Sequence, residues 1–121
     1  MTDTISTARA ISVGELNDLI GNHEDVLIVD VREREEYVQG HIPGALAVPI
    51  GALELAADAT SIAGNDRLVS ARTGTVVICC DDGRRSRVAA AQLPRLGFAN
   101  VYCLAGGLKH WQAAGFPLTQ R

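Results

Sequence analysis

Three short apolar runs, at residues 26–31, 75–80 and 100–104, constrain the fold of this chain more than any other feature. β-Branched residues dominate the first two, and such continuous runs are typical of strands buried on both faces of a parallel sheet. Segments with helical spacing lie between the runs, as in alternating α/β folds. The pattern therefore predicts an open parallel sheet, with right-handed crossovers that place helices on both faces.

Weaker signals predict the remaining elements. Ser12 and Glu15 have the spacing of a capping box at the start of a helix, and Gly40 is suited to ending another. The expected helices cover residues 12–20, 33–39, 50–72 with a break near 64–65, 86–96 and 109–114. Two short strands, near residues 10–11 and at 46–48, bring the predicted sheet to five strands.

Size and charge limit the class of protein. The 121 residues fit one domain, with a core from about residue 11 to residue 118. Hydrophobic residues make up 47% of the chain, enough for an ordinary core. A formal net charge of −3 provides no basic field for nucleic acid or an anionic membrane, so neither partner is expected.

Cysteine usage and the N-terminus indicate a compartment. Three cysteines cannot pair without leaving one over, which favours free thiols in a reducing compartment. No paired C-x-x-C pattern is present, so neither a metal nor another cofactor is expected. Residues 1–10 lack the hydrophobic region of a secretory signal, and no run is long enough to span a bilayer. We expect a cytoplasmic protein, either a monomer or a homodimer.

The candidate catalytic residue is Cys80, at the end of the second apolar run. Ligands of open α/β sheets bind beyond the carboxyl ends of the strands. A helix N-terminus and the N–H groups of a tight loop, which Gly83 permits, favour negative charge there. Arg84 and Arg85 add positive charge, so the site favours the thiolate. Cys79 is expected to point to the opposite face of the strand and to be structural.

Three blocks of sequence resemble one known family. Residues 80–86, Cys-Asp-Asp-Gly-Arg-Arg-Ser, resemble the C-x-x-G-x-R-S active-site loop of single-domain rhodanese-like proteins. The upstream signature is matched by residues 29–32, 36–37 and 40–45, and the C-terminal signature by residues 104–107, Trp111 and residues 115–117. The blocks occur in the order and spacing of the family.

The resemblance implies a rhodanese-like five-stranded parallel sheet and a sulfurtransferase whose Cys80 cycles between thiol and persulfide. A donor such as thiosulfate would transfer its sulfane sulfur to Cys80, and a thiol, cyanide or a sulfur-carrier protein would accept it. Arg85 would bind the anionic donor or the leaving group. The substrate-binding residues would be Asp81, Asp82, Gly83, Arg84 and Ser86.

Asp81 and Asp82 favour a particular class of donor. Carboxylates next to a thiol oppose its ionisation, although the arginines that follow offset them. A cationic or uncharged donor, or a partner protein with a basic surface, therefore fits better than a small dianion.

Other polar residues near the site are assigned supporting roles. Asp30 ends a buried run and needs a partner, and a charge pair with Arg32 would fix the loop below the site. His41 is expected to be a structural hydrogen-bonding residue, and residues 33–36 a solvated helix face. Cys103 fits either a core thiol or a redox partner of Cys80.

Two other functions stay open. The first is a non-catalytic interaction or sensing module on the rhodanese fold. The second is an arsenate reductase or phosphatase of the related Cys-loop type. The resemblance implies that those enzymes have a loop one residue longer than the four residues between Cys80 and Arg85.

Overall fold

The computed structural model describes residues 9–121, so the polar segment 1–8, which bears on the expectation about a secretory signal, lies outside the described residues. A five-stranded sheet has the strand order β1-β5-β4-β2-β3, and each of its pairings is parallel. Its strands are β1 (Arg9–Ile11), β2 (Val26–Asp30), β3 (Leu46–Ala47), β4 (Thr75–Cys79) and β5 (Asn100–Leu104). The predicted five-stranded parallel sheet is confirmed.

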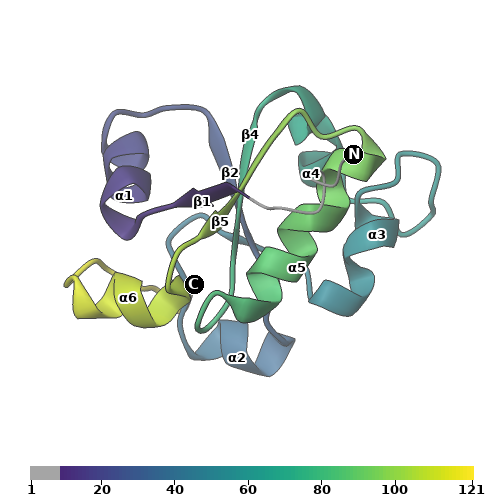
Figure 1. Cartoon of the computed structure of the whole chain (residues 1–121). Coiled ribbons are helices and arrows are strands. Elements are labelled where there is room, and N and C mark those ends of the chain that lie inside the picture. Colours follow the sequence, from purple (N-terminus) through teal and green to yellow (C-terminus); the bar gives the residue numbers. More distant parts are fainter. Residues whose placement is uncertain (1–8) are drawn as a thin grey trace.

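Helices cover both faces of this sheet (Figure 1). They are α1 (Val13–Gly21), α2 (Arg34–Gln39), α3 (Leu53–Ala56), α4 (Asp66–Ser70), α5 (Arg84–Gln92) and α6 (Gly107–Ala113), with 3₁₀ turns η2 (Ile50–Ala52), η3 (Ala71–Thr73) and η4 (Leu93–Leu96). In Figure 1, α1 and α6 lie on one side of the sheet and α3, α4 and α5 on the other. Within residues 9–121, no helix is long and apolar enough to cross a membrane.

Strand alternation divides the core into two hydrophobic clusters. Val77 and Cys79 of β4 pack on the side of Leu16 from α1 and Trp111 from α6. Ile78, their neighbour, packs in the opposite cluster with residues of α3, α4 and α5. Because both faces of β4 are covered, this strand is a continuous apolar run.

The capping box predicted for α1 is present. The Ser12 hydroxyl accepts a hydrogen bond from the Glu15 N–H at 3.0 Å, and the Glu15 carboxylate accepts one from the Ser12 N–H at 2.9 Å. The two residues thus satisfy two N–H groups that the helix itself leaves without partners.

The alanine-rich region contains less helix than its composition predicts. α3 has only 4 residues and α4 only 5, and turns separate them. The Asp58 carboxylate accepts hydrogen bonds from the N–H and the hydroxyl of Thr60 at 2.8 and 2.7 Å. Asn65 caps α4 through the Leu68 N–H at 3.1 Å. These side-chain bonds stabilise turns, and they override the helix propensity of the neighbouring alanines.

Two helices begin earlier than expected. α5 begins at Arg84 rather than Ser86, and α6 begins at Gly107 rather than Lys109. The glycine before each helix has a left-handed φ, 93° at Gly83 and 74° at Gly106, which turns the chain directly from loop into helix. Arg84 and Arg85 therefore belong to the first turn of α5 and not to the loop.

Candidate active site

Cys80 lies at the carboxyl edge of the sheet, directly after β4, and it is fully buried. Its sulfur atom accepts hydrogen bonds from two backbone N–H groups, that of Gly83 at 3.2 Å and that of Ser86 at 3.3 Å. The Ser86 hydroxyl donates to the Gly83 carbonyl at 3.2 Å and holds the turn closed. N–H groups aimed at a sulfur, at the positive end of a helix, stabilise a thiolate relative to a thiol.

The first turn of α6 locks the cysteine loop in place. The Leu108 N–H donates to the Cys80 carbonyl at 2.9 Å, and the Lys109 N–H donates to the Asp81 carbonyl at 3.0 Å. A Cβ atom at Gly107 would lie 2.6 Å from both carbonyl oxygens. The close approach of α6 to the cysteine loop therefore requires glycine at this position.

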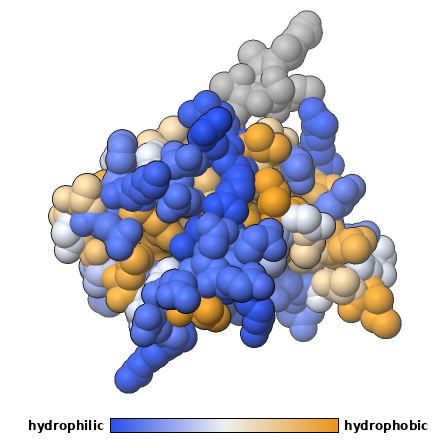
Figure 2. All heavy atoms as spheres, turned by 90° about the horizontal axis from the view of Figure 1, so that it is seen from below, coloured by the Kyte–Doolittle hydropathy of each residue, from blue (hydrophilic) through white to orange (hydrophobic). Residues whose placement is uncertain are grey.

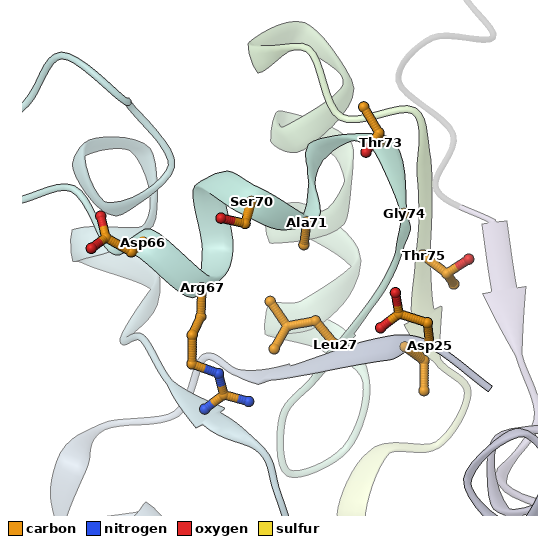
Figure 3. Close-up of a pocket in the computed structure, with 10 residues that line it drawn as sticks. Asp25, Leu27, Asp66, Arg67, Ser70, Ala71, Thr73, Gly74 and Thr75 are labelled. Atoms are coloured by element: carbon orange, nitrogen blue, oxygen red, sulfur yellow. The ribbon is translucent and has the colours of Figure 1, made fainter. Parts of the chain in front are cut away.

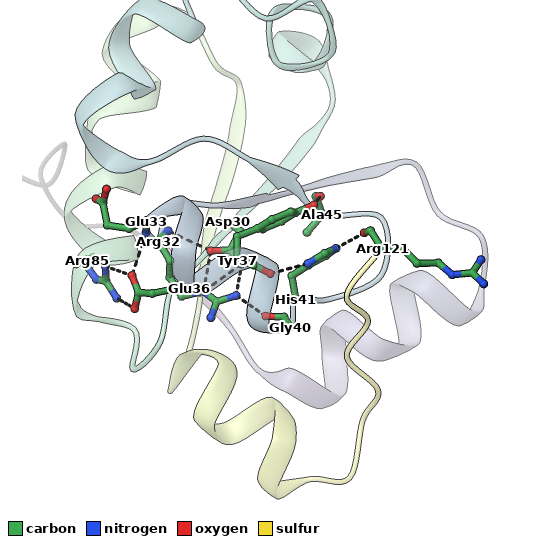
Figure 4. A network of polar contacts seen from close by, with 10 residues as sticks. All are labelled: Asp30, Arg32, Glu33, Glu36, Tyr37, Gly40, His41, Ala45, Arg85 and Arg121. Carbon is green, nitrogen blue, oxygen red and sulfur yellow. Dashed lines mark hydrogen bonds and ion pairs between the residues drawn. The ribbon is translucent and has the colours of Figure 1, made fainter.

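Arg85 does not stand free beside the sulfur. Its two terminal nitrogens donate to the two carboxylate oxygens of Glu36, at 2.9 and 3.0 Å (Figure 4). The hydrogen bonds from Arg85 lower the pKa of Glu36 to about 2, and the same bonds raise the pKa of Arg85. Glu36 was expected on a solvated helix face. Residues 33–35 of that face are exposed as expected, but Glu36 is half-exposed and paired, because α2 places its carboxylate against the first turn of α5.

The two loop carboxylates also have partners. Asp82 accepts a hydrogen bond from the Arg84 N–H at 3.0 Å, and Asp81 lies 3.9 Å from the ammonium group of Lys109. Both contacts are at the surface, so they weaken but do not remove the negative charge near Cys80.

An open cavity of about 460 Å³ lies beside the cysteine loop. Ile50 and Val88 supply its apolar wall, and its polar lining residues are Asp81, Asp82, Arg84 and Arg85. Figure 2 views this end of the molecule and shows hydrophilic side chains across the middle of the face. The cavity has room for a small organic substrate close to the loop.

A second cavity, of about 480 Å³, lies at the opposite end of the sheet (Figure 3). Its lining includes Asp25, just before β2, and Thr75, the first residue of β4. Although it is slightly larger, it lies at the amino ends of the strands, whereas parallel sheets bind ligands at their carboxyl ends. We therefore place the candidate site at Cys80.

Asp30 and Arg32 form a buried ion pair at the end of β2 (Figure 4). A terminal nitrogen of Arg32 lies 2.8 Å from the carboxylate of Asp30 and also donates to the Gly40 carbonyl at 2.7 Å. The Arg32 backbone N–H donates to the same carboxylate at 3.1 Å. These bonds tie the start of α2 to its end, and they hold Glu36 opposite Arg85.

The other two cysteines lack the surroundings of Cys80. Burial raises the pKa of Cys79 well above its usual range, and Cys79 faces the α1 and α6 side of the sheet. Cys103 pairs with Ile78 across β5 and β4 and lies in the same cluster as Cys80, and burial raises its pKa as well. Both thiols are therefore held in the neutral form.

His41 is buried in a structural position. Its ring stacks on Tyr37 with centroids 3.7 Å apart. Its two nitrogens lie 2.9 Å from the Tyr37 carbonyl and 2.7 Å from the Arg121 carbonyl (Figure 4). These contacts join the turn after α2 to the C-terminal residue Arg121.

The structure thus brings Cys80, Gly83 and Ser86 together as the sequence predicts, but it pairs Arg85 with a residue that sequence reasoning missed. The signal for Glu36 was its place in the upstream block, in the first turn of the helix that follows β2, and β2 is the neighbour of β4 in the sheet. The contact of Gly107 with the cysteine loop was likewise missed, and the signal was the Gly-Gly pair at the start of α6.

Comparisons with known proteins agree with this geometry. The rhodanese-like domain family matches residues 12–114. A sulfurtransferase of Allochromatium vinosum is 36% identical over 103 residues, which cover 85% of this chain and 87% of the relative. YrkF of Bacillus subtilis, named as a candidate sulfur carrier protein, is 32% identical over 110 residues. That match covers 91% of this chain, but the chain spans only about half (54%) of the length of YrkF.

A solved structure is also similar. RPA3614 of Rhodopseudomonas palustris, described as a protein of unknown function and a possible tyrosine phosphatase, superposes with a TM-score of 0.85 at 28% identity. The match covers 93% of this chain and 85% of that protein. The family match spans most of the chain and includes the cysteine loop, so this chain belongs to the rhodanese-like domain family.

Proposed function

We propose that this protein is a sulfurtransferase that carries sulfane sulfur as a persulfide on Cys80. The observation that carries the proposal is the pair of N–H groups, from Gly83 and Ser86, directed at the Cys80 sulfur. Membership of a family with a sulfurtransferase relative supports the same activity.

The first half-reaction loads the cysteine. The Cys80 thiolate attacks the outer sulfur of the donor, a sulfur–sulfur bond forms, and the donor's own sulfur–sulfur bond breaks. With thiosulfate, sulfite leaves with the electron pair of the broken bond and Cys80 becomes a persulfide anion. Backbone N–H groups stabilise the thiolate before the attack and the persulfide after it.

The second half-reaction unloads the cysteine. A thiolate or cyanide attacks the outer sulfur of the persulfide, and the Cys80 thiolate departs with the bonding electrons. Because the same N–H groups again stabilise the departing thiolate, neither step needs a general base. The cavity beside Ile50 and Val88 would admit the organic part of the donor or acceptor.

A direct test is the rate of sulfur transfer to cyanide, with thiosulfate and with an alkyl persulfide whose organic group is uncharged as donors. Transfer should be lost in Cys80→Ser and kept in Cys79→Ser, a matched change on the adjacent residue. Transfer by Cys80→Ser at the wild-type rate would overturn the proposal.

The similarity to a possible tyrosine phosphatase favours a second candidate, phosphate-ester hydrolysis at the same cysteine. Its nucleophile would also be the Cys80 thiolate, but the attacked atom would be phosphorus. Hydrolysis of p-nitrophenyl phosphate with no sulfur transfer from any donor would favour this candidate, whereas the reverse result would favour the sulfurtransferase. A protein with neither activity would be an interaction module.

A further inference from the structure

Glu36 competes for the cation that an anionic substrate would use. In a bidentate ion pair, both terminal nitrogens of Arg85 already donate to Glu36, at 2.9 and 3.0 Å. The two side chains are 37% and 38% exposed, so the pair lies at the surface next to the cavity that Arg85 lines. An anion that binds Arg85 must therefore displace the Glu36 carboxylate or share the Arg85 guanidinium group with it.

The rest of the cavity offers little to an anion. Asp81 and Asp82 line it with two further carboxylates, so a dianion would meet like charge on entry. Ile50 and Val88 offer apolar contact instead, and Val88 is 58% exposed. An uncharged organic group can bury part of this surface at no electrostatic cost.

We infer that Glu36 is a specificity-determining residue, which holds Arg85 and thereby favours the neutral R–S–SH form of an organic persulfide over an anionic sulfur donor such as thiosulfate. The inference rests on the proposed function and refines its substrate class. The selected reaction is attack of the Cys80 thiolate on the outer sulfur of R–S–SH. The Cys80 sulfur bonds to that outer sulfur, and the thiolate R–S⁻ leaves with the electron pair. No dianionic leaving group then forms beside Glu36, Asp81 and Asp82.

The chain allows the charge of Glu36 to be removed without loss of its structural role. One carboxylate oxygen of Glu36 also accepts the Glu33 N–H at 2.9 Å and so caps α2. Glutamine serves equally well at this position of a capping box, so Glu36→Gln keeps the helix cap and removes the charge. Glu35→Gln is the matched control, because Glu35 is an exposed residue of the same helix turn.

The first experiment needs no turnover. Iodoacetate and iodoacetamide alkylate thiols with the same leaving group, but only iodoacetate is an anion. The rates at Cys80 are read by peptide mass mapping. The rate with iodoacetate divided by the rate with iodoacetamide should rise about fivefold in Glu36→Gln and stay unchanged in Glu35→Gln. An unchanged ratio in Glu36→Gln would overturn the inference.

The second experiment uses the proposed activity. With thiosulfate, Glu36→Gln should lower KM about fivefold with little change in kcat, because an anionic donor gains Arg85 on binding. With an alkyl persulfide whose organic group is uncharged, KM should change by less than about twofold, because the form that Cys80 attacks, R–S–SH, carries no charge. Equal KM values for thiosulfate in wild type and Glu36→Gln would contradict the role of Glu36 but not the proposed sulfurtransferase activity.

The two experiments separate the inference from the function on which it rests. A fivefold change in the alkylation ratio without sulfur transfer from any donor would uphold the effect of Glu36 on anions and overturn the sulfurtransferase. Sulfur transfer with an unchanged alkylation ratio would uphold the sulfurtransferase and overturn the effect of Glu36 on anions. A Cys80 that reacts with neither reagent would overturn both, because its sulfur would be out of reach of any substrate.

Discussion

The ends of β2 and β4 are neighbours in the sheet, where Asp30 pairs with Cys79. The charged residues at the two ends nevertheless differ in burial. At the end of β2, Asp30 is fully buried and is bonded to Arg32, which is itself bonded to the Gly40 carbonyl. At the end of β4, the buried sulfur of Cys80 receives two N–H groups, and the nearby charge of Arg85 is held by a surface residue.

This difference in burial decides whether a ligand can replace one partner of an ion pair. No ligand can enter the Asp30–Arg32 pair without leaving a buried ion unpaired, which is costly. The Arg85–Glu36 pair is partly exposed, so water or a substrate can replace either partner at small cost. Two ion pairs of similar length therefore differ in what they can do: the first is fixed within the fold, and the second can exchange partners with a substrate in the cavity.

The largest effect is expected where the buried pair is broken. Arg32→Met would leave the Asp30 carboxylate buried without its cation, and should lower the free energy of unfolding by about 3–5 kcal/mol. Urea denaturation measures this, with Arg34→Met, an exposed neighbour, as the control. If both variants unfolded at the same urea concentration as wild type, the buried pair at the end of β2 would not stabilise the fold.

The contact between the cysteine loop and α6 should be next in size. Gly107→Ala would place a Cβ atom 2.6 Å from the Cys80 and Asp81 carbonyls at a φ of +63°. Steric overlap and backbone strain together should cost about 3 kcal/mol and displace Cys80 from its N–H donors.

Gly44→Ala is a matched control for Gly107→Ala. Gly44 also has a positive φ, +85°, but a Cβ atom there would meet nothing within 4 Å. This variant should lose only about 1–2 kcal/mol and keep its activity. Equal losses of stability and activity in the two variants would show that the loop contact has no special importance.

The exposed pair should affect activity more than stability. Arg85→Ala should change the free energy of unfolding by no more than about 1 kcal/mol, because the pair is partly exposed. Its kcat/KM with thiosulfate should fall about tenfold, since the remaining Glu36 carboxylate then repels the donor. Thermal melts and steady-state kinetics on one sample compare the two effects, and a loss of stability without a loss of kcat/KM would reverse the assignment.

The smallest expected effect is a pH dependence. The folded-state pKa of Glu36, about 2, lies below its ordinary value of 4.5, so the ion pair stabilises the protein above about pH 4.5 and loses this contribution as the pH falls towards 2. The difference in melting temperature between wild type and Glu36→Gln should therefore be constant near neutral pH and shrink in acid. A difference that grew in acid would contradict the pair.

The sequence predicts the sheet well because the strands are buried on both faces. Continuous apolar runs at β2 and β4 leave few other structures for those residues, and the position of Cys80 at a strand end follows from them. The alanine-rich region was predicted poorly, because local bonds from Asp58 and Asn65, rather than alanine propensity, decide where its helices end.

The candidate site was predictable only as far as its own loop. The N–H groups that contact Cys80 come from residues 83 and 86, close in sequence. Loop chemistry was sufficient to predict N–H donors within the loop, such as that of Gly83, but it did not single out the Ser86 N–H. Glu36 reaches Arg85 from 49 positions away, because the fold brings α2 close to the first turn of α5. A pairing of this kind depends on tertiary structure, and a charge pattern such as Glu-Arg-Glu-Glu indicates a solvated helix equally well.

The central claim, that Cys80 carries sulfur, is tested most directly by intact mass. Wild type, Cys80→Ser and Cys79→Ser would each be treated with thiosulfate and, separately, with an alkyl persulfide whose organic group is uncharged, and then freed of excess donor. We expect a gain of about 32 Da, one sulfur atom, that cyanide removes, in wild type and Cys79→Ser but not in Cys80→Ser. The same gain in Cys80→Ser, or no gain in wild type with either donor, would contradict the account.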